Sequence, residues 1–179
     1  MYCPEGIEKV LLSEEEIKNK VSEMGELLTR EYDGKNPLFI CVLKGSVVFF
    51  ADLIREMKCP LEIDFLRASS YGSGTVSSGS VQFSVGANID MRGRHVVIVE
   101  DIMDTARTLF ALKNELLKRS PASLKIVTLL DKPSRRVVSG FTADYEGFVI
   151  DDLFVVGYGL DCGEKYRNLP YIGILQLKM

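Results

Sequence analysis

The pattern of hydrophobic positions along the chain predicts helices and strands in alternation. Ser13 and Glu16 form a capping box, a frequent start of a helix. The apolar positions after this box recur mostly every three or four residues and would line one face of a helix of about five turns. These positions are Ile17, Val21, Met24, Leu27 and Leu28.

Three almost unbroken apolar runs predict strands that are buried on both faces. The runs are residues 38–43, 95–99 and 126–130. A helix is predicted after the first run, at 47–57, and another after the second, from about 105 to 118. Strands covered on both faces are typical of parallel sheets with helices on each side. We therefore predict an α/β fold with a mainly parallel sheet flanked by helices.

Alternating apolar residues predict two half-buried strands, around 61–65 and 81–85, that pair antiparallel with each other. Short strands are also predicted at 148–150 and 154–156. The segment 69–80 lies between the two alternating strands and consists largely of serine and glycine. A long loop of this kind is typical either of a disordered segment or of a functional lid, and its composition favours neither.

Composition and charge restrict the class of protein. The chain has 179 residues, of which 46% are hydrophobic and 26% charged, as expected for one globular domain. Its 22 basic and 25 acidic side chains give a net charge of −3, which removes the usual electrostatic argument for nucleic-acid binding. His95 is the only histidine, so a metal centre that needs two histidines is excluded.

The cysteines, the first residues and the length of the apolar runs bear on where in the cell the protein is found. The four cysteines contain no C-x-x-C pair, which argues against a zinc knuckle or a thioredoxin-like site. The first residues lack the basic and apolar regions of a signal peptide. The longest apolar runs reach about seven residues, whereas a membrane-spanning helix needs about 20. We expect a cytoplasmic protein with reduced thiols.

The end of the second apolar run carries the strongest chemical signal. Glu100 and Asp101 follow that run directly. The polar turn after them carries Asp104, Thr105 and Thr108, and a helix then begins, where free N–H groups and the helix dipole favour an anion. Helix capping alone would explain Asp104 or Thr105. It does not explain two adjacent carboxylates at the end of a buried strand, so we favour a site for a phosphate and a metal ion.

Other phosphate-binding motifs do not match. The chain has no G-x-x-x-x-G-K-[ST] motif, and Gly157, Gly159 and Gly163 are spaced one residue too widely for G-x-G-x-x-G. Aspartyl-phosphate hydrolases carry D-x-D-x-T, whereas Asp101 and Asp104 are one residue further apart than the two aspartates of that motif. Nucleotide hydrolases with a P-loop and dinucleotide-binding proteins are therefore disfavoured.

Residues 97–109 resemble the phosphoribosyl pyrophosphate-binding signature of type I phosphoribosyltransferases, a hydrophobic strand followed by E-D-x-x-D-[ST]-[GA]-x-T. Four other segments are similar to the hypoxanthine-guanine branch of that family. They are Leu43-Lys44-Gly45, Ser70-Tyr71-Gly72, Lys132, and residues 154–161 with Tyr166 and Arg167. The matches follow the order of the family from about residue 38 to residue 174.

This resemblance implies a purine salvage enzyme. Members of that branch convert hypoxanthine or guanine and phosphoribosyl pyrophosphate to IMP or GMP and pyrophosphate, with Mg²⁺ as cofactor. Two alternatives stay open: a xanthine-preferring phosphoribosyltransferase, and a non-catalytic relative that regulates by binding nucleic acid. The acidic charge balance argues against the second alternative. We therefore expect small-molecule substrates, with neither nucleic acid nor a membrane as a partner.

The resemblance also implies an architecture. It predicts the type I phosphoribosyltransferase fold in a single domain over 1–179, with a core at about 35–160 and a mobile loop at 68–80. A small hood would come from the C-terminal segment, with the N-terminal segment as a second contributor. Members of the family commonly form homodimers or homotetramers, so we expect one of these assemblies.

Roles at the acidic strand end follow from the same resemblance. Asp104 would be the catalytic residue, exchanging a proton with N7 of the purine. Glu100 and Asp101 would face the ribose hydroxyls and bind Mg²⁺. The 5′-phosphate would be bound by Asp104, Thr105, Ala106, Arg107 and Thr108.

Three more groups of residues complete the implied site. The pyrophosphate group consists of Lys44, Gly45 and Arg167. The purine group consists of Lys132, Phe154, Val155 and Asp161. The loop group consists of Ser70 and Tyr71, which would close over the reacting atoms.

The resemblance gives each of these groups a contact. Family members hold the bond between Leu43 and Lys44 in the cis form. Lys132 would donate to O6 of the purine and Phe154 would stack on the ring. Val155 and Asp161 would read the 2-position, and Asp161 would also bind a second Mg²⁺.

One position departs from the common family pattern. Many members carry glycine where this chain has Ala106. Because a Cβ is strained at positive φ, the turn must use negative φ there or tolerate a small cost. The geometry of the 5′-phosphate pocket depends on which of these holds.

Overall fold

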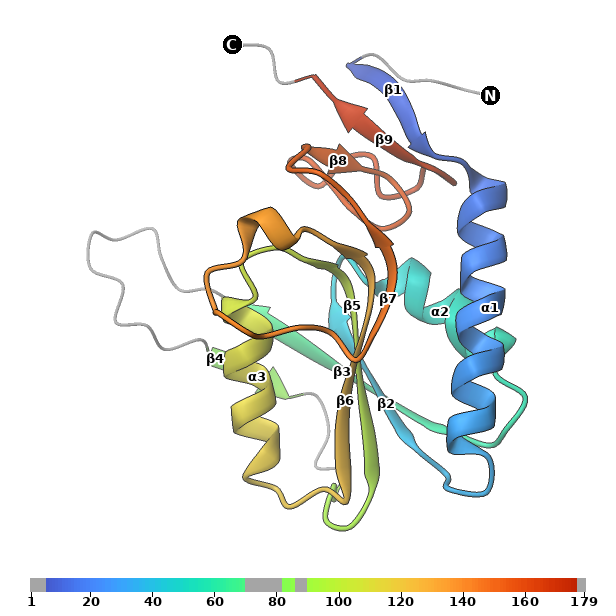
Figure 1. The fold of residues 1–179 in the computed structure, drawn as a ribbon, viewed down its shortest axis with the longest axis vertical. Helices are drawn as coiled ribbons and strands as arrows, with labels where there is room; N and C mark the ends of the chain where they lie inside the picture. The colour runs from blue at the N-terminus through green and yellow to red at the C-terminus, as the bar shows by residue number, and fades with distance from the viewer. Residues whose placement is uncertain (1–5, 70–81, 86–89, 177–179) are drawn as a thin grey trace.

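The computed structural model describes residues 6–69, 82–85 and 90–176. Its largest element is a six-stranded sheet with the strand order β4-β3-β2-β5-β6-β7 (Figure 1). The strands are β2 (Leu38–Leu43), β3 (Glu62–Ser69), β4 (Gln82–Val85), β5 (His95–Met103), β6 (Ser123–Asp131) and β7 (Tyr145–Val149). β4 pairs antiparallel with β3, as predicted, and the other neighbours are parallel. The predicted α/β fold with a mainly parallel sheet is confirmed.

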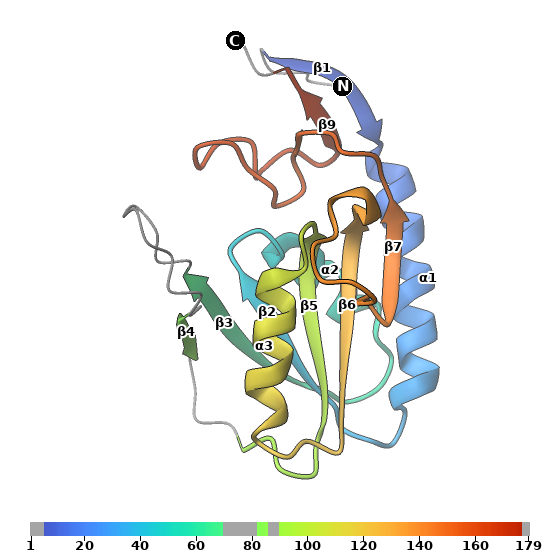
Figure 2. The same ribbon diagram turned by 60° about the vertical axis from the view of Figure 1, so that its left-hand side comes forward.

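Helices cover both faces of this sheet. α1 (Glu14–Tyr32) and α2 (Val47–Glu56) lie on one face, and α3 (Arg107–Leu117) lies on the other (Figure 2). Side chains alternate along a strand, so Phe39 and Cys41 of β2 join the core under α1 and α2, while Ile40 and Val42 join the core under α3. This burial on both faces explains why the central strands consist almost entirely of apolar residues. In the described part of the chain, no helix is long and apolar enough to cross a membrane.

α1 begins where the capping box predicts. The Glu16 N–H donates to Ser13 Oγ at 3.2 Å, and the Ser13 N–H donates to Glu16 Oε2 at 2.8 Å. The predicted apolar face is one position too wide, because Leu27 is 40% exposed while Leu28 is fully buried. The helix therefore buries a narrower stripe than the sequence pattern indicates.

Two boundaries near the acidic strand end differ from the predictions. β5 continues to Met103, past the point at 99 where the apolar run stops. α3 begins at Arg107 instead of near 105, because Ala106 adopts a left-handed conformation that a helix cannot contain. Glu100 and Asp101 thus belong to the strand itself.

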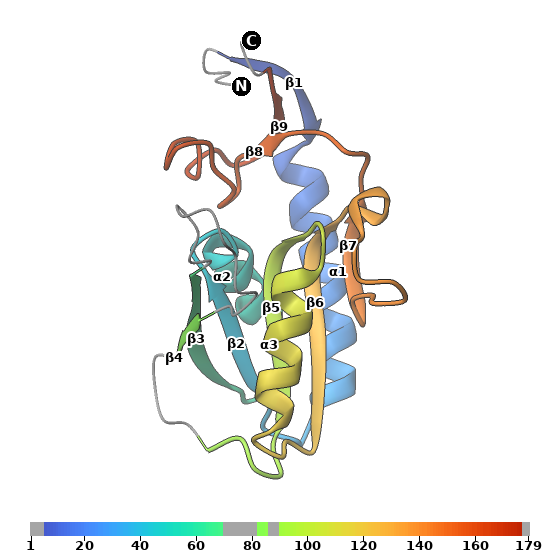
Figure 3. The same ribbon diagram turned by 90° about the vertical axis from the view of Figure 1, so that its left-hand side faces the viewer.

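A second sheet of three strands joins the two ends of the described chain. It has the order β1-β9-β8, and both pairs are antiparallel. The strands are β1 (Ile7–Leu12), β8 (Val155–Val156) and β9 (Ile172–Leu175). β1 and β9 were not predicted, because each is short and its partner lies at the other end of the sequence. The sheet lies beyond the carboxyl ends of the parallel strands, the edge at which α/β proteins bind ligands (Figure 3).

Candidate active site

Two carboxylates lie side by side near the end of β5. Glu100 and Asp101 are half-buried, Asp101 Oδ1 accepts from the N–H of Ile102 at 2.8 Å, and Glu100 Oε1 accepts from the N–H of Asp101 at 3.3 Å. Burial raises the pKa of Glu100 well above its usual value, and the charge of Asp101 adds to the rise. Burial also raises the pKa of Asp101, against the opposing effect of its hydrogen bonds with Glu100 and Ile102. A pair of poorly solvated carboxylates of this kind suits a cation.

The turn between β5 and α3 forms one wall of a cavity. Ala106 is buried and has φ 64. The turn therefore tolerates a strained positive φ at this alanine, at a cost of about 1 kcal/mol, instead of using a negative φ. The N–H groups of the first turn of α3, which begins at Arg107, have no partners within the helix. The cavity has a volume of about 260 Å³ and is lined by residues of β2, β5, the turn and the start of α3, including Glu100, Asp104 and Thr108. An anion in this cavity would meet the helix start.

The loop after β2 packs against Asp101. The peptide bond between Leu43 and Lys44 is cis, as the resemblance implies. A Cβ built on Gly45 would lie 1.6 Å from Asp101 Oδ2. On the opposite side of the loop, a Cβ built on Gly159 would lie 2.0 Å from the carbonyl oxygen of Gly45. Glycine is required at both positions, because the loop is packed between β5 and the segment that follows β8.

Lys44 and Arg167 meet at Glu164. Lys44 Nζ lies 3.0 Å from Glu164 Oε1, and Arg167 Nη2 lies 3.3 Å from Glu164 Oε2. Arg167 Nη2 also lies 2.8 Å from Asp161 Oδ1, and its Nη1 donates to the Gly159 carbonyl at 2.8 Å. Hydrogen bonds from Lys44 and then Arg167 lower the pKa of Glu164. The structure thus brings two members of the pyrophosphate group together around an acidic residue.

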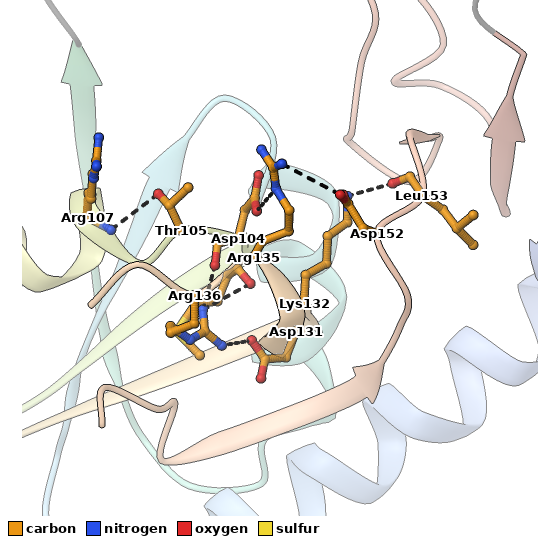
Figure 4. Close-up of polar contacts among 10 residues, drawn as sticks. Asp104, Thr105, Arg107, Asp131, Lys132, Arg135, Arg136, Asp152 and Leu153 are labelled. Atoms are coloured by element: carbon orange, nitrogen blue, oxygen red, sulfur yellow. Dashed lines mark hydrogen bonds and ion pairs between the residues drawn. The ribbon is translucent and has the colours of Figure 1, made fainter. Parts of the chain in front are cut away.

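Lys132 and Asp104 lie at neighbouring strand ends (Figure 4). Lys132 follows β6 and is buried, and its Nζ donates to the Leu153 carbonyl at 2.6 Å and lies 3.9 Å from Asp152 Oδ1. Asp104 follows β5, and its Oδ1 accepts from Arg135 Nε at 3.1 Å. Arg135 Nη1 in turn lies 3.6 Å from Asp152 Oδ2. The polar ends of both side chains are therefore held by contacts within the protein.

Arg136 fixes the backbone of the turn after β5. Its Nη1 donates to the carbonyl oxygens of Met103 at 3.3 Å and Asp104 at 2.7 Å. Its Nη2 pairs with the carboxylate of Asp131, which is only 4% exposed. The backbone N–H of Lys132 also donates to Met103, at 3.0 Å. The segment after β6 therefore holds the main chain on which Asp104 stands.

Comparison with known proteins adds an independent observation to this geometry. A family model described as the phosphoribosyl transferase domain matches residues 9–162. The chain belongs to the phosphoribosyltransferase family.

Relatives of known name and structure lie in one branch of the phosphoribosyltransferases. A hypoxanthine-guanine phosphoribosyltransferase of Lactococcus lactis subsp. lactis is 56% identical over 170 residues, which cover 95% of this chain and 92% of the relative. The fold is similar to that of a hypoxanthine phosphoribosyltransferase from Staphylococcus aureus, with a TM-score of 0.90, 47% identity and coverage of 96% and 92% of the two chains. The fold is also similar to that of a hypoxanthine-guanine phosphoribosyltransferase from Bacillus anthracis, solved with a HEPES molecule in its active site. The TM-score is 0.89, the identity is 47%, and the match covers 95% of this chain and 99% of that chain. The predicted family and its fold are confirmed.

Two further residues expected at the purine site of this phosphoribosyltransferase differ in how exposed they are. Phe154 lies just before β8 and is 43% exposed, so its ring is open to solvent instead of belonging to the core, as its apolar neighbours alone would indicate. Val155 is buried within β8. Ser70 and Tyr71 lie outside the described residues, so their role as a loop group stays a prediction.

Sequence reasoning missed five charged residues that contact the expected site or support it from behind. They are Asp131, Arg135, Arg136, Asp152 and Glu164. The available signal was the pair of successive arginines that begins four residues beyond the end of β6 and three residues beyond Lys132. That signal is weak, because charged residues in loops are mostly solvated.

Proposed function

We propose that this phosphoribosyltransferase transfers the 5-phosphoribosyl group from phosphoribosyl pyrophosphate to hypoxanthine or guanine, giving IMP or GMP and pyrophosphate. One observation carries the proposal: Asp104 and Lys132 stand at the carboxyl ends of two adjacent parallel strands, beside the helix start that lines the cavity. The turn 104–108 would hold the 5′-phosphate through the N–H groups at the start of α3 and the hydroxyls of Thr105 and Thr108. The anomeric carbon of the ribose would then lie between the phosphate site and the purine site.

The purine would replace contacts that the protein makes with itself. Lys132 Nζ, now bonded to the Leu153 carbonyl, would donate to O6 and select 6-oxopurines over 6-aminopurines. Asp104 would exchange a proton with N7, a form of general acid–base catalysis that contributes typically about 10²–10⁴-fold. Phe154 would stack on the ring, and the backbone of Val155 would read the 2-position together with Asp161.

The carboxylates of β5 fit a magnesium ion. Glu100 and Asp101 would offer hard oxygen ligands in a poorly solvated place, and this burial also raises the pKa of each. Among the described residues no three side chains of the metal-binding types cluster together, which suits an ion that takes one or two carboxylates and completes its shell with substrate oxygens and water. Bound Mg²⁺ would neutralise charge on the leaving pyrophosphate. Asp161 would bind a second ion only after it leaves its ion pair with Arg167.

Pyrophosphate would be held by the loop after β2 and by Arg167. Lys44 would supply a cation, and Gly45 would let the backbone approach the anion closely. Arg167 would supply a second cation, which is linked to Lys44 through Glu164. Arg167 Nε is buried and has no hydrogen-bond partner among the described residues. Charge-assisted contacts of this type stabilise the charge that develops on the leaving group.

We further infer the organisation around the site. The core at about 35–160 carries the phosphate and metal groups, and the three-stranded sheet β1-β9-β8 would be the hood that covers the purine. The assembly would be a homodimer or homotetramer in the cytoplasm. Sedimentation of the purified protein tests the assembly directly.

An assay of base preference tests the proposed function. The protein is incubated with phosphoribosyl pyrophosphate, Mg²⁺ and one of hypoxanthine, guanine, xanthine or adenine, and released pyrophosphate is measured. Release with hypoxanthine and guanine supports the proposal, and release with xanthine alone would instead favour a xanthine-preferring enzyme. Release with no base contradicts the enzyme function, and tight RNA or DNA binding would then favour a regulator. Asp104→Asn should lower kcat by about 10²-fold or more while nucleotide still binds.

A further inference from the structure

A row of side chains with alternating charge joins Asp104 to Lys132. Arg135 Nε lies 3.1 Å from Asp104 Oδ1, and Arg135 Nη1 lies 3.6 Å from Asp152 Oδ2. The other oxygen of Asp152, Oδ1, lies 3.9 Å from Lys132 Nζ. Figure 4 shows the row crossing from the turn after β5 to the segment before β8. The two inner residues, Arg135 and Asp152, have no role in the function proposed above.

The two ends of this row would meet neighbouring atoms of one substrate. On a 6-oxopurine, N7 and O6 lie next to each other on the same edge of the base, and both accept hydrogen bonds. Asp104 would act at N7 and Lys132 at O6, so the separation of their polar ends must match that edge. A small misplacement of either side chain is costly for catalysis.

We propose that Arg135 and Asp152 form a positioning bridge that sets Asp104 and Lys132 in register with N7 and O6 of the purine. The bridge rests on the proposed function, because it acts through the two residues that this function assigns to the base. Neither Arg135 nor Asp152 is among the residues assigned above to phosphoribosyl pyrophosphate. Loss of the bridge should therefore affect the purine more than the other substrate.

The chemistry of arginine suits this place. A planar guanidinium presents fixed donors in several directions, so one side chain can contact a carboxylate on each side. Arg136 already holds the carbonyl of Asp104 at 2.7 Å, so the main chain of the turn does not depend on Arg135. On Asp104, Arg135 therefore orients only the side-chain carboxylate and not the main chain.

Exposure separates this role from a structural one. The side chains of Asp104, Arg135 and Asp152 are 41%, 48% and 54% exposed. Ion pairs between exposed side chains contribute little to folding stability. Removing the bridge should therefore leave the melting temperature nearly unchanged and appear in purine turnover.

Steady-state kinetics of Arg135→Gln, Asp152→Asn and the double variant test the bridge. For each single variant we expect kcat/KM for hypoxanthine to fall about tenfold, with the KM for phosphoribosyl pyrophosphate and the Tm unchanged. The double variant should fall little further, because both changes break the same bridge. Arg135→Lys keeps the charge without the planar fork and should lie between Arg135→Gln and the wild type. Arg92→Gln, at an exposed position before β5 at the opposite end of the sheet, serves as the matched control and should have full activity.

Several outcomes would overturn the bridge. They are unchanged hypoxanthine kinetics in Arg135→Gln, equal losses for both substrates, and losses that multiply in the double variant. A failure of the proposed function is distinguishable from these, because the wild-type protein would then release no pyrophosphate with any base. That result would remove both proposals before a variant is compared.

Discussion

Gly45 lies so close to Asp101 that a Cβ on the glycine would be 1.6 Å from Asp101 Oδ2. The other carboxylate oxygen, Oδ1, is held by the N–H of Ile102 at 2.8 Å, so the carboxylate cannot turn away without losing this bond. The loop assigned to pyrophosphate and the carboxylate assigned to Mg²⁺ are therefore packed as one unit. A change at either residue is transmitted to the other.

Gly45→Ala should disable the site more than it disturbs the fold. The added methyl group must displace Asp101 or the loop, and we expect kcat/KM for phosphoribosyl pyrophosphate to fall about 100-fold. Overpacking of this kind also lowers stability by about 1–3 kcal/mol. Gly34→Ala is the control, because Gly34 has φ +72 and open space around it, so that variant should lose some stability and keep its kcat/KM. Wild-type kinetics in Gly45→Ala would show that the packing has no functional consequence.

The parts of the fold that the sequence predicted are those with a local signal. The capping box of α1 and the apolar runs of β2 and β6 can each be recognised within a few consecutive residues, and the structure confirms these elements. The small sheet was missed because β1 pairs with β9, so that Ile7 lies opposite Leu175, and no local pattern carries that information. The end of β5 was misjudged because hydrophobicity stops at 99, whereas pairing with β6 continues to Met103.

The same distinction applies to the site. Glu100, Asp101 and Asp104 stand in one contiguous motif that the sequence displays directly. Arg136 reaches the Asp104 carbonyl across 32 residues, and Lys44 reaches Glu164 across 120. Such partners are set by how loops meet at the edge of the sheet. Sequence reasoning assigned the charged groups of the motif and missed the residues that hold them.

Glu164→Gln should strengthen the binding of pyrophosphate. Glu164 forms ion pairs with both cations of the pyrophosphate group, at 3.0 Å from Lys44 and 3.3 Å from Arg167. An anionic ligand must displace this carboxylate, so its removal should lower the Kd of pyrophosphate about three- to tenfold at low salt. Isothermal titration calorimetry in the presence of Mg²⁺ measures the change.

The effect of Glu164→Gln should shrink at high ionic strength, because exposed charges are screened. Glu115→Gln provides the control, since Glu115 forms a similar exposed pair with Lys118 at 2.6 Å, away from the site. Weaker binding of pyrophosphate by Glu164→Gln would mean that the carboxylate organises the two cations instead of competing for them.

Arg136→Met should destabilise the whole protein. Asp131 is 4% exposed and would be left as a buried carboxylate without its ion-pair partner, at a cost of about 3–5 kcal/mol. The carbonyl oxygen of Asp104 would also lose the Arg136 donor, and that of Met103 would keep only the N–H of Lys132. Urea unfolding should show a lower midpoint at an unchanged m-value. Arg135→Gln, one residue away and exposed, should unfold like the wild type. Equal midpoints for Arg136→Met and Arg135→Gln would contradict the stabilising role of Arg136.

The raised pKa of Glu100 makes the stability of the metal-free protein depend on pH in a specific direction. In the unfolded chain Glu100 titrates near its ordinary value of about 4.3, and burial raises its pKa well above that in the folded protein. Between these two values the folded state binds more protons than the unfolded state, so the contribution of Glu100 becomes less favourable as the pH rises. Above the pKa of the folded state the penalty is complete, because a poorly solvated carboxylate must then carry its charge.

Glu100→Gln removes this penalty and should therefore raise the Tm relative to the wild type by more at about pH 8 than at about pH 5 in Mg²⁺-free buffer. Comparison of the two proteins at each pH cancels the titration of the groups that do not interact with Glu100. Thermal unfolding followed by circular dichroism measures the difference, and addition of Mg²⁺ should stabilise the wild type more than the variant, because binding to the folded state raises the Tm. A Tm difference that stays constant or shrinks from pH 5 to pH 8 would show that Glu100 keeps an ordinary pKa, and the strongest physical argument for a cation beside it would be lost.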